Sequence, residues 1–204
     1  MSAYAKLPAS PFKEIAFNAG VIASEFDVDA GALEKENILF ATTGGSSFTP
    51  NLATLDLLED VDNAKVGTKQ AFMITGCDPH LTTTVLTVGE KNLEYLMPNS
   101  TKTTEGDAIK MTQYDGIVSQ DSFHDLWLIV DYGTMTDKAG STQSGYFAIH
   151  LKNCLNVNGL QPQTTKDGKT TYSVDFRAFY DGEVDDEVPY EVYYKVATAS
   201  SDAA

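Results

Sequence analysis

The chain contains three histidines, and their neighbours are the first test for acid–base or metal chemistry. His80 lies two residues after Asp78, and His124 directly precedes Asp125. Zinc sites place histidines and cysteines at short, regular spacings, such as two histidines four residues apart on a helix. None of these histidines, His150 included, has a partner at such a spacing. The pattern therefore favours solvated or sheet-packed histidines, and no metal site is expected.

Two acidic clusters could supply the carboxylate pair of a glycosidase. They lie at 59–62 and 183–187, and both are polar runs typical of solvated loops. The segments 27–34 and 60–68 superficially resemble calcium loops, but neither has the glycine and the glutamate that such a loop needs at its sixth and twelfth positions. We therefore expect no cofactor.

Sequence motifs for other reactions are missing as well. The chain has no P-loop, no GxGxxG and no GxSxG, and its Ser, His and Asp residues have no spacing that indicates a triad. Cys77 and Cys154 lack the spacing of a redox pair, so two reduced thiols and synthesis in the cytosol are expected. The chain is predicted not to be an enzyme. A hydrolase that uses His80 or His124 stays open as the weaker alternative.

The net charge is the strongest signal in the composition. Asp and Glu number 29 against 14 Lys and Arg, which gives a formal net charge of −15 and a pI near 4.4. Arg177 is the only arginine, and the lysines are scattered along the chain. Proteins that hold duplex DNA need clustered basic residues, so ordinary DNA binding is disfavoured. Solubility alone would also account for the acid excess.

Length and hydrophobicity predict one soluble domain over 1–204. The 204 residues are 42% hydrophobic and 21% charged, and a chain of this size buries roughly 70–75% of its unfolded surface. The N-terminus has no apolar run of signal-peptide length, and no later stretch approaches the length of a membrane span. We therefore expect no membrane partner.

Strand patterns dominate the chain. The nearly continuous apolar run at 125–132 predicts a strand buried on both faces, and 146–151 has the same character. A second hairpin is predicted from 160–165 and 169–180, joined by an Asp-Gly turn, with Asp175 on the polar face of the outgoing strand. Further strand candidates are 20–26, 38–42 and 189–196.

The stretch 68–97 predicts a hairpin followed by the one clear helix. The hairpin is expected to reverse at 76–79, where glycine, aspartate and proline favour a turn, and to continue at 82–88. Apolar residues spaced three and four apart predict a helix at 89–97. The polar stretch 98–121 is predicted to be a long connection.

These elements predict a mainly β fold, a β-sandwich or open barrel with one flanking α-helix. Residues 1–18 are expected to form an extended N-terminal arm, and 197–204 a flexible tail. Long strands with open edges invite pairing with another copy, and a head-to-tail pairing that closes gives a ring.

Residues 46–66 are predicted to form an extended loop that is too apolar to be free in solution. Such a segment either folds back over its own domain or buries its apolar residues against another chain. The candidates for inter-subunit contact are Phe48, Pro50, Leu52, Leu55, Leu57 and Leu58.

Several stretches together resemble one protein family. They are NAGVIASEFD (18–27), ATTGGSSFTPNLATLDLLEDVDN (41–63), GCDPHLTTTVLTV (76–88), DLWLIVDY (125–132), GYFAIHLKNCLNVNGL (145–160) and TTKDGKTTYSVDFRAFYD (164–181). In order and spacing they resemble the major tail proteins, or tail tube proteins, of long-tailed bacteriophages, particularly phages of Gram-positive hosts. The likeness spans most of the chain.

The resemblance implies a structural virion protein, assembled in the host bacterial cytoplasm into stacked six-membered rings. The rings form a hollow tail tube that delivers the genome, and DNA passes through it without specific binding. The expected partners are further copies of the chain and the tape measure, tail-tip and terminator proteins. By this likeness, 46–66 reaches an adjoining ring and the helix at 89–97 covers the outside of the sheet.

The resemblance also gives the acid excess a hypothetical role, because carboxylates on the inner wall would repel phosphates. Asp175 is the candidate for such a lumen-facing carboxylate, and an outward, solvated position for it is equally compatible with the pattern. The alternative function is a carbohydrate-binding or adhesin-like β-sandwich, which would use exposed aromatic residues such as Tyr190, Tyr193 and Tyr194.

Overall fold

The computed structural model describes residues 20–131, 135–136, 142–166, 168–184 and 187–199. The extended N-terminal arm expected at 1–18 lies outside these residues, as does the end of the expected tail, 200–204. Residues 197–199 do not begin a tail, because they continue the last strand.

The described residues form antiparallel strands and a few short helices. The strands are β1 Val21–Ala23, β2 Thr42–Thr49, β3 Leu52–Asp56, β4 Phe72–Cys77, β5 His80–Val85, β6 Ser100–Glu105, β7 Ala108–Gln113, β8 His124–Asp131, β9 Met135–Thr136, β10 Thr142–Asn156, β11 Pro162–Gln163, β12 Thr171–Ala178 and β13 Tyr190–Ala199. The helices are α2 Leu93–Leu96 and two 3-10 turns, η1 Lys35–Asn37 and η2 Gln120–Ser122. The predicted mainly β class is confirmed.

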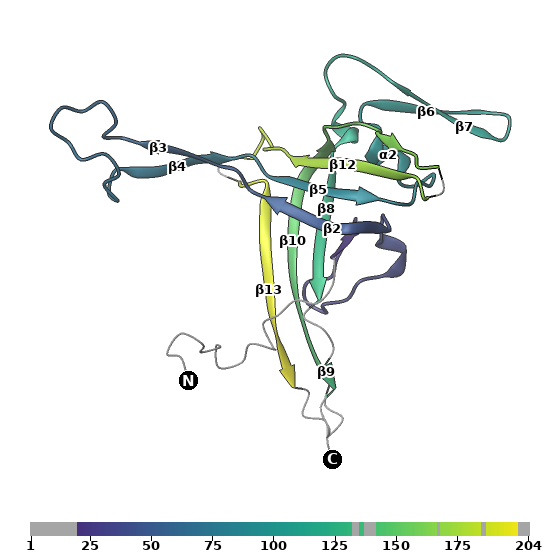
Figure 1. Cartoon of the computed structure of the whole chain (residues 1–204), viewed down its shortest axis with the longest axis horizontal. Coiled ribbons are helices and arrows are strands. Elements are labelled where there is room, and N and C mark those ends of the chain that lie inside the picture. Colours follow the sequence, from purple (N-terminus) through teal and green to yellow (C-terminus); the bar gives the residue numbers. More distant parts are fainter. Residues whose placement is uncertain (1–19, 132–134, 137–141, 167, 185–186, 200–204) are drawn as a thin grey trace.

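Strand β10 organises the main sheet, because it pairs with strands on both of its sides. On one side it pairs with β8, which in turn pairs with β1. On the other side, residues 143–151 pair with β13, whereas 154–156 pair with β12. Strand β12 continues to β5 and β2. The sheet thus has two parts that share β10, and Figure 1 shows β12, β5 and β2 crossing β8, β10 and β13.

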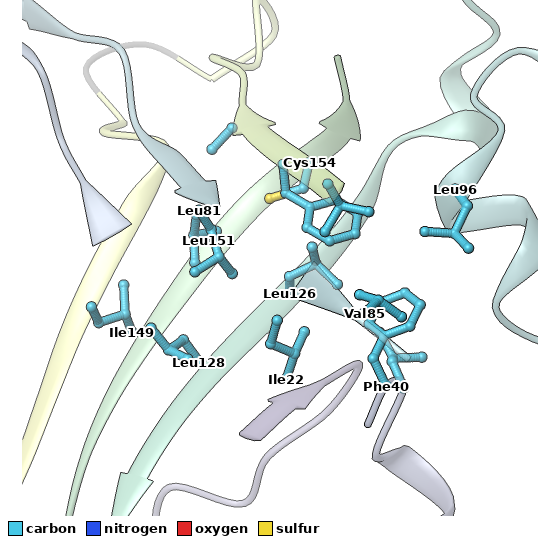
Figure 2. Packing of buried hydrophobic residues seen from close by; sticks show 14 residues of the cluster. Ile22, Phe40, Leu81, Val85, Leu96, Leu126, Leu128, Ile149, Leu151 and Cys154 are labelled. Carbon is cyan, nitrogen blue, oxygen red and sulfur yellow. The ribbon is translucent and has the colours of Figure 1, made fainter. Parts of the chain in front are cut away.

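The two parts of the sheet enclose one hydrophobic core. Leu126 of β8 and Leu151 of β10 are fully buried, and so is Leu81 of β5. Phe176 of β12 joins the same cluster, and Figure 2 shows side chains from both parts meeting there. Sheets that pack face to face in this way bury one face of each strand and leave the other for solvent. The alternation predicted for β12 is confirmed, since its buried residues are Val174, Phe176 and Ala178.

A second cluster covers the opposite face of β8 and β10. Trp127, Ile129 and Tyr146 are buried there, and Phe26 from the segment after β1 packs on them. The Phe26 ring meets the edge of Tyr146 with the ring centroids 4.9 Å apart, and the Tyr146 hydroxyl donates to the Val28 carbonyl. Both faces of these strands are therefore buried, as the apolar runs predict.

Residues 42–85 form one long hairpin, which corrects two expectations. Strand β2 pairs with β5, and β3 pairs with β4, so the chain reverses within 57–71. The reversal predicted at 76–79 is wrong, because β4 pairs with β3 instead of β5. The extended loop predicted at 46–66 contains the end of β2 and all of β3.

Three other segments differ from prediction. The helix expected at 89–97 is only α2, four residues long, and it packs on the core through fully buried Leu96. The connection expected at 98–121 contains the hairpin β6–β7, whose exposed faces carry no hydrophobic alternation to reveal it. The strand predicted at 38–42 is not formed, because Ile38 makes only an isolated bridge, to Ala23, and Thr42 already begins β2.

Asn156 ties these elements together from inside the core, where its side chain is 1% exposed. Its amide nitrogen donates to the Leu96 carbonyl at 3.0 Å and the Gly159 carbonyl at 2.9 Å. Its amide oxygen accepts from the Asp175 backbone N–H at 3.2 Å. One buried side chain thus joins α2, β10 and β12, and both its amide nitrogen and its amide oxygen are hydrogen-bonded.

Asn156→Ala should lower the free energy of unfolding by about 2–4 kcal/mol, because it leaves a buried carbonyl and a buried N–H without partners. Urea unfolding followed by circular dichroism measures the loss. The matched control is Asn158→Ala, two residues along and exposed, which should change stability by less than about 0.5 kcal/mol. Equal effects of the two substitutions would contradict this role for Asn156.

Candidate assembly surface

The hairpin formed by β3, β4 and the connecting residues 57–71, here called the arm, exposes an unusual amount of apolar surface. Figure 1 shows it projecting away from the crossed sheets. On and directly beside its two strands, six large apolar side chains are between 44% and 58% exposed, namely Leu52, Leu55, Leu57, Phe72, Met73 and Ile74. Single exposed apolar residues are ordinary, but a contiguous group marks an interaction surface or an aggregation hazard.

The hairpin β6–β7 also projects from the body, as Figure 1 shows, and it has a different surface. Its strands read STKTTE and AIKMTQ, and most of their residues are exposed. Lys110 pairs with Glu105 across the hairpin at 2.7 Å, and Lys102 pairs with Glu90 at 2.5 Å. A projecting hairpin in this chain can therefore be polar, so the apolar arm is not a general consequence of hairpin formation.

The base of the arm is held to the body by hydrogen bonds at the end of β4. The Asp78 N–H donates to the Pro50 carbonyl at 3.0 Å, which joins the two strands where they leave the sheet. The Cys77 N–H donates to the Tyr180 hydroxyl at 2.8 Å, and Arg177 Nε donates to an Asp78 carboxylate oxygen at 2.6 Å. Because Arg177 belongs to β12 and Tyr180 follows it, the arm is attached to the core sheet.

The tip of the arm is ordered by one carboxylate. Asp56 accepts hydrogen bonds from the backbone N–H groups of Leu58, at 3.0 Å, and Gly67, at 2.6 Å. These two bonds favour the charged form and hold the pKa of Asp56 below its usual value. Gly67 has a φ of +80°, which a residue with a Cβ adopts at a steric cost. The turn therefore keeps its shape while its exposed acidic residues remain in water.

Three of the six predicted contact residues, Leu52, Leu55 and Leu57, are exposed on the arm. Sequence reasoning missed the partners that lie beside them on β4, which are Phe72, Met73 and Ile74. The sequence predicts those three in the first strand of the hairpin that reverses at 76–79. Their continuous apolar run was a signal, but only the pairing of β3 with β4 places them on the arm.

The other three predicted contact residues have different settings. Phe48 packs against the hydrophobic core, and its ring centroid lies 5.3 Å from that of Tyr190. Pro50 lies at the base of the arm, where its carbonyl accepts the Asp78 N–H. Leu58 is half-buried in the tip turn. Of the six predicted residues, Leu52 and Leu55 of β3 and Leu57 just after it therefore contribute to the apolar surface.

Asp175 lies on the outer face of β12, in an ion-paired setting. Both of its carboxylate oxygens contact His80 Nδ1, at 2.9 and 3.0 Å, and its side chain is only 17% exposed. His80 Nε2 lies 3.4 Å from Asp78, which also pairs with Arg177. The strands beside this cluster contribute hydroxyl groups, including Ser47, Thr82, Thr84 and Ser173. This face is therefore rich in hydroxyls, and its carboxylates have cationic or imidazole partners.

The histidines do not form a catalytic arrangement of the kind tested from the sequence. Both ring nitrogens of His80 face carboxylates, so neither is positioned to take a proton from a hydroxyl. His150 stacks on Trp127 with ring centroids 4.2 Å apart. Burial lowers the pKa of His124, whose ring lies 4.5 Å from Tyr95. In the part of the chain that the structure describes, no group of three His, Cys, Asp or Glu residues could hold a metal ion.

The tyrosines of β13 do not form one platform for a carbohydrate ring. Side chains alternate along a strand, so Tyr190 and Tyr194 point to one face and Tyr193 to the other. Tyr193 packs on Trp127 with centroids 5.4 Å apart, and its hydroxyl donates to Glu191 at 2.5 Å. The three rings suggested for an adhesin-like site are therefore divided between opposite surfaces.

Strand β13 offers a second surface for association. Among the described strands it pairs only with β10, so its other edge carries backbone groups without a sheet partner. Val192 on this strand is 50% exposed. Long edge strands of this kind readily pair with another chain.

A lysine on β10 holds the start of this edge strand. Lys152 Nζ donates to Glu187 and, at 2.8 Å, to Glu191 on β13. These hydrogen bonds raise the pKa of Lys152 to about 12. The pKa of Glu191 is lowered, first by the bond from Lys152 and then by the bond from Tyr193. The charged forms on both strands therefore stabilise the pairing of β10 with β13.

No family model matches the chain, and no curated protein matches it. The resemblance to tail tube proteins therefore stays a prediction. Within the described residues, no helix has the length and apolar character needed to cross a membrane. The exposed arm and the open edge of β13 carry the functional argument.

Tyr180→Phe should loosen the base of the arm, because the phenyl ring keeps its packing but cannot accept the Cys77 N–H. The lost hydrogen bond costs about 1 kcal/mol, so exchange of the Cys77 amide hydrogen should accelerate by about five- to tenfold. Hydrogen exchange followed by mass spectrometry measures this. Tyr114→Phe is the control, since it removes a 3.0 Å hydrogen bond from Thr101 on the other hairpin. Unchanged exchange at Cys77 would contradict the anchoring role.

Lys152→Met should lower the free energy of unfolding by about 1 kcal/mol near neutral pH. The raised lysine pKa means that this contribution is complete below pH 10.5 and is lost as the pH rises through about 12. The lowered glutamate pKa means that it is also complete above pH 4.5 and is lost as the pH falls further.

The difference between the wild type and Lys152→Met should therefore be constant between pH 4.5 and pH 10.5 and shrink on both sides. Thermal unfolding over this pH range measures it. Lys110→Met, which breaks an exposed pair on β6–β7, is the control and should have an effect below about 0.5 kcal/mol. A difference that grows in acid would contradict the assignment.

Proposed function

We propose that this chain is a structural protein that assembles with copies of itself into the tail tube of a bacteriophage. In this proposal the copies form six-membered rings, and the rings stack into a hollow conduit for genome delivery. The tube is assembled in the host cytoplasm and becomes part of the virion, where it meets the tape measure, tail-tip and terminator proteins. It has no enzymatic role and needs no cofactor.

The apolar arm is the observation that carries the proposal. A flexible loop could bury its leucines on its own domain, but Tyr180 and Arg177 hold the base of this arm to the body. The six apolar side chains on and beside its strands are therefore presented to the surroundings, with roughly half of each exposed. Covering such side chains is worth about 1.5–3 kcal/mol for each one fully buried, which favours contact with another chain.

A second copy of the same chain is a suitable partner because the molecule has two different association surfaces. The arm projects from the β2–β5 side of the body, whereas β13 runs along another edge, as Figure 1 shows. Contact between two different surfaces is heterologous, and it produces a ring when the rotation closes or a filament when it does not. A tube of stacked rings uses one contact that closes each ring and another that joins successive rings into a filament.

The polar face of β12, β5 and β2 fits a conduit through which DNA passes without being held. Its hydroxyl groups keep water at the surface, and Arg177, the only arginine in the chain, is already paired with Asp78. The formal net charge of −15 disfavours lasting contact with phosphates. These features support passage in preference to binding.

Leu55→Asp should abolish assembly of the purified chain, because burying a carboxylate in an apolar contact costs several kcal/mol. We expect wild-type protein to form rings or tubes in negative-stain images when it is concentrated. Light scattering should show that the variant stays monomeric up to at least about a hundredfold the concentration at which the wild type assembles.

Thr103→Asp is the matched control, because it places the same charge on an exposed strand of the β6–β7 hairpin. It should leave assembly unchanged. A wild-type chain that remains monomeric when concentrated, or a Leu55→Asp variant that assembles normally, would contradict the proposal.

A further inference from the structure

The arm is apolar on both of its faces. Cross-strand pairing places Thr54 beside Ile74 and Asp56 beside Phe72, and by alternation these side chains share one face with Leu52. Leu55 pairs with Met73 on the opposite face, where Leu57 follows by the same alternation. The irregular pairing between Ala53 and Thr54 leaves its extra residue on β4, so the alternation along β3 continues and Leu52 lies on the first face. Each face therefore presents three large, half-exposed apolar side chains.

Neither face alone is large enough for a stable contact. A fully buried aromatic side chain covers roughly 150–250 Å², so three half-exposed apolar side chains offer on the order of 300 Å². A stable interface buries roughly 800 Å² on each partner. Covering one face would therefore leave the contact small and the other three side chains in water. Covering both faces roughly doubles the buried area and removes the exposed apolar surface.

We propose that the arm inserts between two other copies of the chain, so that each copy covers one face of the arm. This inference rests on the proposed self-assembly and adds to it that one arm joins three copies. A ribbon that lies on the surface of a single neighbour would leave its second face exposed, whereas a ribbon at the junction of two neighbours would leave neither.

The chain itself supplies apolar surface that suits this contact. Val192 on β13 is 50% exposed and shares a sheet face with Phe147 of β10 and Val130 of β8, both only partly buried. Figure 1 shows the arm projecting away from the crossed sheets, whereas β13 runs down from them, so the outer part of the arm does not lie along β13 within one copy. Copies of the same chain can join them.

Thiol labelling of neighbouring positions on β4 tests this inference, because Met73 and Ile74 point to opposite faces and are 44% and 58% exposed. Met73→Cys and Ile74→Cys are each made in a Cys77→Ser background, and Thr103→Cys on β6 is the control. Cys154 is 2% exposed, and burial raises its pKa, so it should react slowly. Maleimide labelling is measured in the dispersed chain and in sedimented assemblies, with each variant diluted into wild-type protein.

Both arm positions should react readily in the dispersed chain and at least about tenfold more slowly in the assemblies, with less than about a twofold change at the control position. Protection of only one arm position would show that the arm lies on a single copy, which overturns this inference and leaves the self-assembly standing. Protection of neither would also overturn it, as would protection already present in the dispersed chain. Absence of any assembly would overturn both proposals.

Photo-cross-linking gives a second readout that a merely structural effect would not produce. In chains diluted into unlabelled wild-type protein, a benzophenone attached at position 73 or 74 alone should yield covalent dimers within the assemblies. A chain that carries the label at both positions should also yield covalent trimers, because each face meets a different copy. Dimers alone from the doubly labelled chain would overturn the inference.

Discussion

The pairing of β10 with β8, β12 and β13 is the constraint on which the rest of the structure depends. Because its first part pairs with β13 and its last three residues pair with β12, one strand belongs to both crossed parts of the sheet. The core between those parts then forms from the inward side chains of β8, β10, β12 and β5. Asn156 ends β10 and satisfies the backbone groups that meet there.

The same framework explains how a well-packed molecule can carry an apolar arm. Strands β2 and β5 complete the sheet and continue into β3 and β4, so the arm is an extension of core strands and inherits their pairing. Hydrogen bonds to Tyr180 and from Arg177 attach its base to the body. The protein thus retains exposed apolar surface at a fixed place, which costs solubility in the free chain and favours association.

Charge has a different distribution from the one that the acid excess suggests. The tip of the arm carries acidic residues in water, whereas Asp175 on the polar sheet face is paired with His80. In the proposed tube, a wall made of this hydroxyl-rich face, with its charges paired, would interact weakly with phosphates. It would not need a dense row of carboxylates. The overall negative charge would then oppose adhesion at longer range, as far as salt permits.

The sequence by itself determined the mainly β class, the doubly buried strands β8 and β10, the alternation of β12 and the apolar character of Leu52, Leu55 and Leu57, because these follow from local hydrophobic period. Only the tertiary structure decided which strands pair. The chain continues from β4 into β5 where a reversal was expected at 76–79, and the helix is limited to α2. Pairing with β3 places Phe72, Met73 and Ile74 on the arm. Strand pairing joins residues far apart in the chain, so no local pattern specifies it.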